Sequence, residues 1–229
     1  MSYLLGYIVA DGCITNDRTR KKNPFTLNIT SIDKEHLLNI KHALGSEYKL
    51  SKKTNGRGGG AYQLQIRNRI LCEDLIRLGV IPRKTYRLQP IRIPKKYLSD
   101  FVRGFFDGDG TVYLYKVNGV IQIKAGFVCV RKAFLMDLNR RLCEALSIPV
   151  KSLHQNDTSG NMIRYATAFY IDDCDKLKQF MYKNRPGLFL RRKWNIFKMW
   201  SSVKRRKYRK QEYPSKIGWH LKINFGMMK

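Results

Sequence analysis

One nine-residue pattern occurs twice in the chain and constrains the fold more than any other feature. The segment LLGYIVADG at residues 4–12 shares its spacing of apolar, glycine, aromatic and acidic positions with VRGFFDGDG at residues 102–110. Both copies end in an aspartate and a glycine, and the two aligned acids, Asp11 and Asp109, are 98 residues apart. Such self-similarity predicts two related structural units rather than one irregular domain.

The residues after each copy repeat one order of predicted elements. Alternating apolar and polar side chains indicate strands, and apolar spacings of three to four indicate helices. The first half has strands at 25–32, 47–53 and 61–67, a turn at 54–60, and helices at 33–45 and 70–79. The second half has strands at 111–116, 119–130, 150–155 and 162–171, and helices at 131–146 and 174–183. The second half therefore has the order α-β-β-α-β-β-α, and the repeat predicts the same order, an α+β fold, for the first half, where three of the four strands are recognised.

The same order suggests where the halves begin and end. We expect halves at residues 1–86 and 98–200, joined by a linker at 87–97 whose Pro90 and Pro94 disfavour regular structure. Trp194, Phe197 and Trp200 predict a helix packed on the second half. Residues 201–229 are expected to form a basic C-terminal tail.

Small residues in both motif copies predict how the halves meet. Gly6 and Ala10 are four residues apart, as are Gly104 and Gly108, so each pair lies on one helix face and permits close approach of two backbones. Packing the two helices about a pseudo-twofold axis would place Asp11 and Asp109 side by side at matching helix C-termini. The helix dipole and mutual repulsion both disfavour two carboxylates there, which predicts a divalent cation between them.

Composition narrows the classes of partner. The chain has 45 Lys and Arg against 17 Asp and Glu, a formal net charge of +28, which favours a nucleic acid as partner. No long apolar span or basic amphipathic anchor indicates a membrane. The five cysteines are scattered without a C-x-x-C pair, and no secretory signal is recognisable, so we expect free thiols and an intracellular protein in the cytoplasm, nucleoid or an organelle matrix.

The paired motifs resemble those of the LAGLIDADG homing endonucleases, specifically the single-chain, two-motif type. Similarity extends to LGVIPRKT and FLRRKW, which resemble the ends of the family's two repeats. The resemblance implies two antiparallel sheets that form a DNA-binding saddle around the central motif helices, in an intron-encoded monomer. It also implies a double-strand break with short 3′ overhangs at a long, asymmetric DNA target. Asp11 and Asp109, with the carbonyls of Ala10 and Gly108, would bind Mg²⁺, with Mn²⁺ as a substitute.

Strand alternation predicts which side chains face the DNA. If the apolar residues of each strand pack against the helices, the other parity faces outward and offers amide, hydroxyl and basic groups suited to the major groove. Two halves would then read about 20 bp, two turns of DNA. The predicted contacts are Thr26, Asn28, Thr30, Lys49, Ser51, Lys53, Gln63, Gln65, Arg67, Tyr113, Tyr115, Gln122, Lys124 and Arg164.

The resemblance also implies a shell of basic or amide residues around the metals. Arg67 best matches the family's basic position and is our third candidate catalytic residue, whereas the matching position of the second half is Tyr170. Ser31 and Cys129 stand where the family carries amides. Two alternatives stay open: an RNA maturase of the same fold that binds intron RNA, and a DNA-binding regulator that does not cleave.

Overall fold

The computed structural model describes residues 1–17, 19–20, 22, 24–54, 60–158, 162–183 and 187–208. Most of the turn predicted at 54–60, and the predicted tail after residue 208, lie outside the described residues. Within the described part of the chain, no helix is long and apolar enough to cross a membrane.

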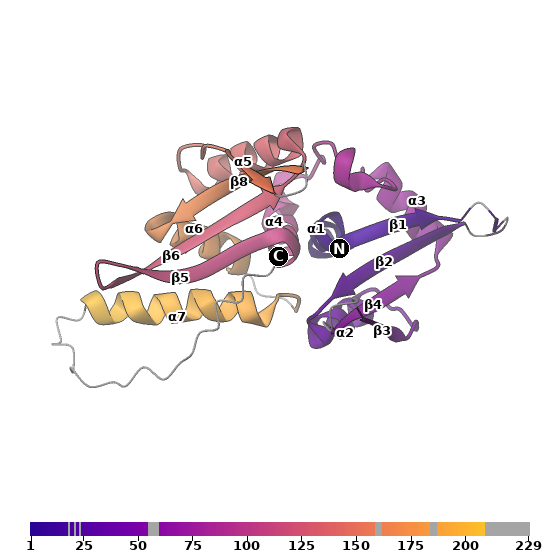
Figure 1. Cartoon of the computed structure of the whole chain (residues 1–229), viewed down its shortest axis with the longest axis horizontal. Coiled ribbons are helices and arrows are strands. Elements are labelled where there is room, and N and C mark those ends of the chain that lie inside the picture. The colour runs from indigo at the N-terminus through magenta and orange to yellow at the C-terminus, as the bar shows by residue number, and fades with distance from the viewer. Residues whose placement is uncertain are drawn as a thin grey trace.

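The first half is one four-stranded antiparallel sheet with its helices, on the right of Figure 1. The strand order is β1-β2-β4-β3, so the strand after the motif helix is an edge strand. The elements are α1 (Ser2–Asp11), β1 (Gly12–Asn16), β2 (Phe25–Ser31), α2 (Lys34–Ala43), β3 (Leu50–Thr54), β4 (Gly60–Ile66) and α3 (Arg69–Arg77).

The second half repeats this topology with the order β5-β6-β8-β7, which confirms the predicted α+β fold of two related halves. Its elements are α4 (Leu98–Asp109), β5 (Gly110–Val117), β6 (Val120–Cys129), α5 (Lys132–Leu146), β7 (His154–Thr158), β8 (Met162–Tyr170) and α6 (Ile171–Tyr182). The register is also repeated, because Gly12 pairs with Ile29 and Gly110 pairs with Phe127.

Local sequence signals account for several element ends. Gly45 has a φ of +59°, and the amide of Ser46 reaches back to the Lys41 carbonyl, so glycine ends α2 as predicted. Asn118 and Gly119 both have positive φ and form the predicted tight turn between β5 and β6. The Asn68 side chain accepts a hydrogen bond from the Leu71 amide and thereby caps α3.

Helices α1 and α4 pack against each other at the centre of the molecule (Figure 1). A Cβ atom added at Gly6 would lie 2.1 Å from the Phe101 carbonyl oxygen, and one at Gly104 would lie 2.0 Å from that of Tyr3. Real side chains do not tolerate such contacts, so backbone meets backbone at both positions. The predicted role of the small residues is confirmed.

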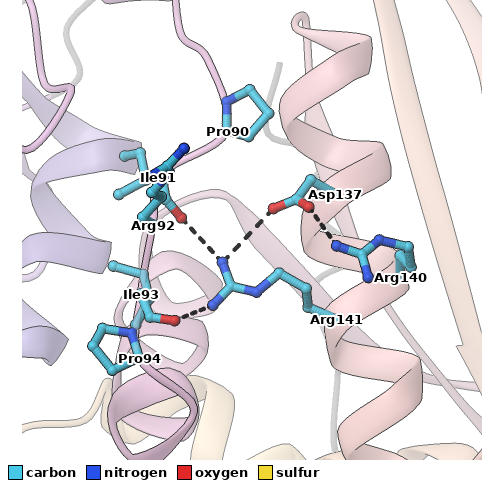
Figure 2. A pocket seen from close by; sticks show the side chains of 8 residues that line it. All are labelled: Pro90, Ile91, Arg92, Ile93, Pro94, Asp137, Arg140 and Arg141. Carbon is cyan, nitrogen blue, oxygen red and sulfur yellow. Dashed lines mark hydrogen bonds and ion pairs between the residues drawn. The ribbon is translucent and has the colours of Figure 1, made fainter.

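The segment between the halves has no strand and only short 3₁₀ turns, η1 (Lys84–Tyr86) and η2 (Lys95–Tyr97), yet it is firmly attached to the second half. Figure 2 shows a pocket between this segment and α5. Across it, the Arg141 guanidinium donates to the carbonyls of Ile91 and Ile93 and pairs with Asp137. Ile91 and Ile93 are themselves buried in the core. The linker is thus irregular in structure but packed against the second half.

A last helix, α7 (Arg191–Tyr208), has no counterpart in the described residues of the first half and lies along the edge strand β5 (Figure 1). Phe197 and Trp200 are buried and Trp194 packs against the core, as predicted. The helix continues across the predicted boundary at residue 200, because this apolar stripe extends to Val203.

Candidate metal centre and nucleic-acid interface

The two motif acids occupy equivalent positions where the halves meet. Asp11 is the last residue of α1 and Asp109 the last of α4, and a strand begins directly after each. Gly108, beside Asp109, lies so close to Asp11 that an added Cβ would be 3.4 Å from its Oδ2 atom. The structure therefore brings both acids to one junction, as the small residues predicted.

Burial raises the pKa values of both acids at this junction, and the charge of Asp11 adds to the rise at Asp109. Surrounding protein atoms desolvate Asp109 and, together with the negative charge of Asp11, raise its pKa to about 6, although the residue is exposed on one side. Lys84, Lys193 and Arg164 oppose that rise. Desolvation likewise raises the pKa of Asp11, against its hydrogen bond with Tyr7 and the charges of Lys193 and Lys84.

A buried lysine closes the C-terminal end of α4. Lys193 Nζ lies 2.6 Å from the Phe106 carbonyl oxygen, 2.8 Å from that of Asp107 and 2.6 Å from that of Gly110. The Gly108 oxygen is farther, at 3.3 Å. Burial lowers the pKa of Lys193 to about 8, against the attraction of Asp107. Because an ammonium has three N–H donors, the three short contacts use them and leave the Gly108 carbonyl least engaged.

Lys84 is the corresponding residue of the first half. Its Nζ donates to the Ala10 carbonyl at 2.9 Å, and both Asp11 and Asp109 act on its charge while burial lowers its pKa. Sequence reasoning missed both lysines as site residues. The available signal was their shared place in the repeat ends, PRKT and RRKW.

The donor set fits a hard divalent cation. Two carboxylates and the carbonyls of Ala10 and Gly108 are oxygen ligands of the kind that Mg²⁺ and Mn²⁺ accept, and each carbonyl has two lone pairs, so a lysine contact leaves one free. Among the residues described, no cluster of three or more His, Cys, Asp or Glu side chains could hold a metal. A cation at this junction would therefore complete its shell with water and substrate phosphate, as Mg²⁺ commonly does.

Arg67 does not lie at this junction, contrary to the prediction that it supports the metal site. Ile66, next to it, pairs with Leu27, whereas Gln63 pairs with Thr30 near the end of β2 that faces Asp11. Arg67 is thus about 13 Å farther along β4 than Gln63 at the usual rise per residue. Sequence alignment gave Arg67 the family's basic position, but the register puts it at the opposite end of the sheet, like Tyr170 of β8.

The outward face of the first sheet carries the polar parity predicted for DNA contacts. Thr26, Asn28 and Thr30 of β2 share it with Gln63 and Gln65 of β4 and with Ser51 and Lys53 of β3, while Leu27, Ile29 and Leu64 are buried on the other face. Lys49 is exposed but precedes β3. Asn28 is a correction: only 9% exposed, it donates to Thr15 Oγ1 and accepts from Gln65 Nε2 at 2.8 Å, because it lies between two neighbouring strands.

The outward face of the second sheet is more aromatic. The Tyr113 and Tyr115 rings are 6.0 Å apart, and the Tyr115 hydroxyl donates to Gln122. Lys124 lies 5.4 Å above the Tyr170 ring. Arg164 is exposed near the Asp109 end of β8, where its charge lowers the pKa of that acid. Tyr113, Tyr115, Gln122 and Lys124 were predicted from parity, and the register places them on one face, whereas Arg164 lies on a strand whose alternation is ambiguous.

Comparison with known proteins agrees with this architecture. Residues 1–78 match the model of the LAGLIDADG-like domain. A solved structure of mesophilic variants of the homing endonuclease I-DmoI is similar, with 15% identity, a TM-score of 0.56, and coverage of 82% of this chain and 94% of that one. The structure of the LAGLIDADG homing endonuclease I-GzeII in complex with its DNA target is also similar, with 12% identity, a TM-score of 0.59, and coverage of 90% of each chain.

A third similar structure is the LAGLIDADG meganuclease I-AabMI bound to uncleaved DNA, with 13% identity, a TM-score of 0.58, and coverage of 90% of this chain and 91% of that one. No curated protein sequence matches the chain. At these identities the structural similarity establishes the fold, and the sequence match covers the first half. The chain has the fold of the single-chain LAGLIDADG homing endonucleases, and its first 78 residues match the sequence model of a LAGLIDADG-like domain.

Proposed function

We propose that this protein is a site-specific DNA endonuclease that makes a metal-dependent double-strand break with short 3′ overhangs at a long, asymmetric target. The observation that carries the proposal is the meeting of Asp11 and Asp109 at one helix junction, between two sheets whose outward faces are polar. A carboxylate pair with a raised pKa and flanking lysines is an arrangement suited to phosphodiester hydrolysis and is hard to explain in a purely structural helix end.

Each residue of the junction has a definite task in this proposal. Asp11 and Asp109, with the carbonyls of Ala10 and Gly108, would hold Mg²⁺ or Mn²⁺, and each acid would serve one DNA strand. A bound divalent cation supplies charge stabilisation to the phosphate and a more acidic water. Lys84 orients the Ala10 carbonyl, Lys193 holds the end of α4 and leaves the Gly108 carbonyl open, and both lysines add positive charge where the phosphates would lie.

The polar sheet faces are the proposed DNA-binding surface, one half of the chain on each half of the target. Solved proteins of the same fold support DNA as the partner, since I-GzeII and I-AabMI have been solved bound to DNA. An I-DmoI variant is recorded with its target DNA in the presence of Mn. The asymmetry of the two faces, amide-rich in one half and tyrosine-rich in the other, supports an asymmetric target.

The deciding experiment is selection of cleaved sites from a randomised duplex library incubated with the purified protein and Mg²⁺. We expect a single family of sites about 20 bp long, cut on both strands. Binding to selected duplexes without cleavage of any of them, with Mg²⁺ or with Mn²⁺, would instead favour a regulator of the same fold.

Asp11→Asn and Asp109→Asn test the site itself. Each change removes a ligand charge but keeps the side-chain shape, so double-strand cleavage should fall by about a thousandfold, equivalent to about 4 kcal/mol. DNA affinity in a mobility-shift assay should be unchanged. Asp74→Asn, which alters an exposed acid of α3, is the matched control and should cleave normally. Normal cleavage by both motif variants would refute the assignment.

A further inference from the structure

The two halves differ at one position of the motif that touches an acid. Tyr7 is four residues before Asp11 on α1, whereas the equivalent residue of α4, four before Asp109, is Phe105. The neighbouring strand differs as well: the repeated register makes Ser31 of β2 equivalent to Cys129 of β6. Both differences concern groups that donate hydrogen bonds.

In the first half these groups form a chain that ends on the acid. Hydrogen bonding of the Tyr7 side chain with Asp11 and with Ser31 is among the causes that shift the pKa of Tyr7, and its hydrogen bonding with Asp11 opposes the rise in the pKa of that acid. The Ser31 hydroxyl in turn accepts from the Asp33 amide at 3.1 Å. Since a carboxylate only accepts, the tyrosine donates to Asp11, and the serine donates to the tyrosine oxygen.

The Tyr7 ring has little freedom to turn away from the acid. Its side chain is only 1% exposed. It stacks on Tyr3 with ring centroids 6.3 Å apart and meets the His36 ring edge at 5.1 Å. The hydroxyl is thus aimed at Asp11 by packing, because a buried ring held on two sides keeps one rotamer.

In the second half the same positions cannot supply this donor. Phe105 is buried, stacks on Phe127 at 6.0 Å and contacts Phe134, but carries no hydroxyl. Cys129 accepts from the Arg131 amide through Sγ at 3.4 Å. Asp109 therefore lacks the contact that fixes Asp11, and it is the more exposed of the two acids.

We propose that Tyr7 is a positioning residue that orients Asp11 toward a divalent cation, so that the two half-sites are unequal and the DNA strand served by Asp11 is cut faster. The inference rests on the proposed endonuclease activity. Hydrogen bonds to a ligating carboxylate fix its orientation, and their removal commonly costs about 10- to 100-fold in metal affinity or activity.

The test is Tyr7→Phe, which makes the first half resemble the second, assayed on a duplex with a different label on each strand. Asp11→Asn and Asp109→Asn establish which strand each acid serves. We expect Tyr7→Phe to slow the Asp11 strand by about 10- to 100-fold and the other strand far less, so that nicked duplex accumulates. Equal slowing of both strands, or no slowing, would overturn the inference.

Tyr3→Phe is the matched control. It removes another buried hydroxyl of α1, one that bonds to Asp107 and His36 and not to Asp11, so it reproduces the packing and stability change alone. We expect it to alter both strand rates by one common factor. A strand bias of the same size in Tyr3→Phe would show that the effect of Tyr7 is merely structural.

A second readout does not need cleavage. Binding of Mn²⁺ to the whole protein, followed by the electron paramagnetic resonance signal of the free ion, should be about tenfold or more weaker in Tyr7→Phe than in Tyr3→Phe. If the parent protein cuts no duplex, the proposed function fails, and this titration still decides the role of Tyr7. Equal Mn²⁺ affinity in the two variants would overturn that role.

Discussion

At the scale of single residues, the site depends on charges that the fold forces together. Asp107 and Asp109 are the same residue type, two positions apart, but burial gives them different roles. Asp107, one residue before Gly108, is 1% exposed, and it accepts from the Tyr3 hydroxyl at 2.7 Å and from the Leu190 amide at 2.8 Å. It therefore binds the start of α7 to the motif helices, whereas Asp109, two residues later, is open to solvent at the proposed metal site.

The raised pKa of Asp109 predicts competition between protons and metal. With its pKa near 6, Asp109 becomes protonated as the pH falls through 6, whereas an ordinary aspartate stays ionised to about pH 4. The Mg²⁺ concentration for half-maximal cleavage should thus rise up to about tenfold per pH unit below 6. Titrations of cleavage against Mg²⁺ at several pH values measure this, and an unchanged requirement down to pH 5 would contradict it.

At the scale of elements, the contact between α1 and α4 sets the geometry of the site. The closest approaches are of main chain to main chain, so the distance between the acids follows from the absence of side chains at Gly6 and Gly104. A second tie is the first turn of α7, where Arg191 pairs with Glu35 and Arg192 with Asp33 of the first half. The same turn supplies Lys193 to the second half.

Gly104→Ala should separate the two helices. Its methyl group would lie 2.0 Å from the Tyr3 carbonyl oxygen, which is backbone and cannot rotate away. Overpacking of this kind costs about 1–3 kcal/mol or more, so chemical denaturation should show that loss and cleavage should fall with it. Gly60→Ala, where the added Cβ meets no atom within 4 Å, is the control and should keep the parent stability. A fully stable, active Gly104→Ala would refute the backbone contact.

At the scale of the whole molecule, two sheets with polar outward faces flank the helix pair in a chain of net charge +28. The lysines and arginines on those faces differ in role from those on the helices. Lys53 is exposed on β3 toward the proposed DNA, while Lys176 of α6 donates to the Ser147 carbonyl. Replacing either lysine by glutamine removes one charge, but only the replacement of Lys53 removes a proposed phosphate contact.

DNA affinity should therefore fall steeply with salt, and the steepness should report which lysines touch phosphate. Each neutralised phosphate adds about −0.9 to the slope of log affinity against log salt concentration. Lys53→Gln should make the slope about one unit shallower, whereas Lys176→Gln should leave it unchanged. Fluorescence anisotropy over a salt series measures both. Equal slopes for the two variants would show that Lys53 does not contact a phosphate.

The sequence alone determined the repeat, the element order apart from the first strand β1, the outward faces of β2 to β6 and the meeting of Asp11 with Asp109. These follow from local periodicity and from glycine spacing, which act within a few residues and so can be read from the chain. The alternation of β2 and β4 assigned the correct face even where the expected exposure of Asn28 was wrong. The exposure of a side chain depends on which strands lie beside it, and the alternation within one strand does not reveal its neighbours.

Only the tertiary structure decided which charged side chains reach the acids. Lys84 and Lys193 are 73 and 84 residues from the acids whose helices they cap, and only their shared place in the repeat ends distinguishes them from the other basic residues of a chain with 45 Lys and Arg. Arg67 was misplaced for the same reason, because alignment gives a position in the repeat but not its distance along the sheet. Both lysines are largely shielded from water, so their N–H groups cannot rely on water as acceptor. The carbonyls at the helix ends accept those hydrogen bonds instead.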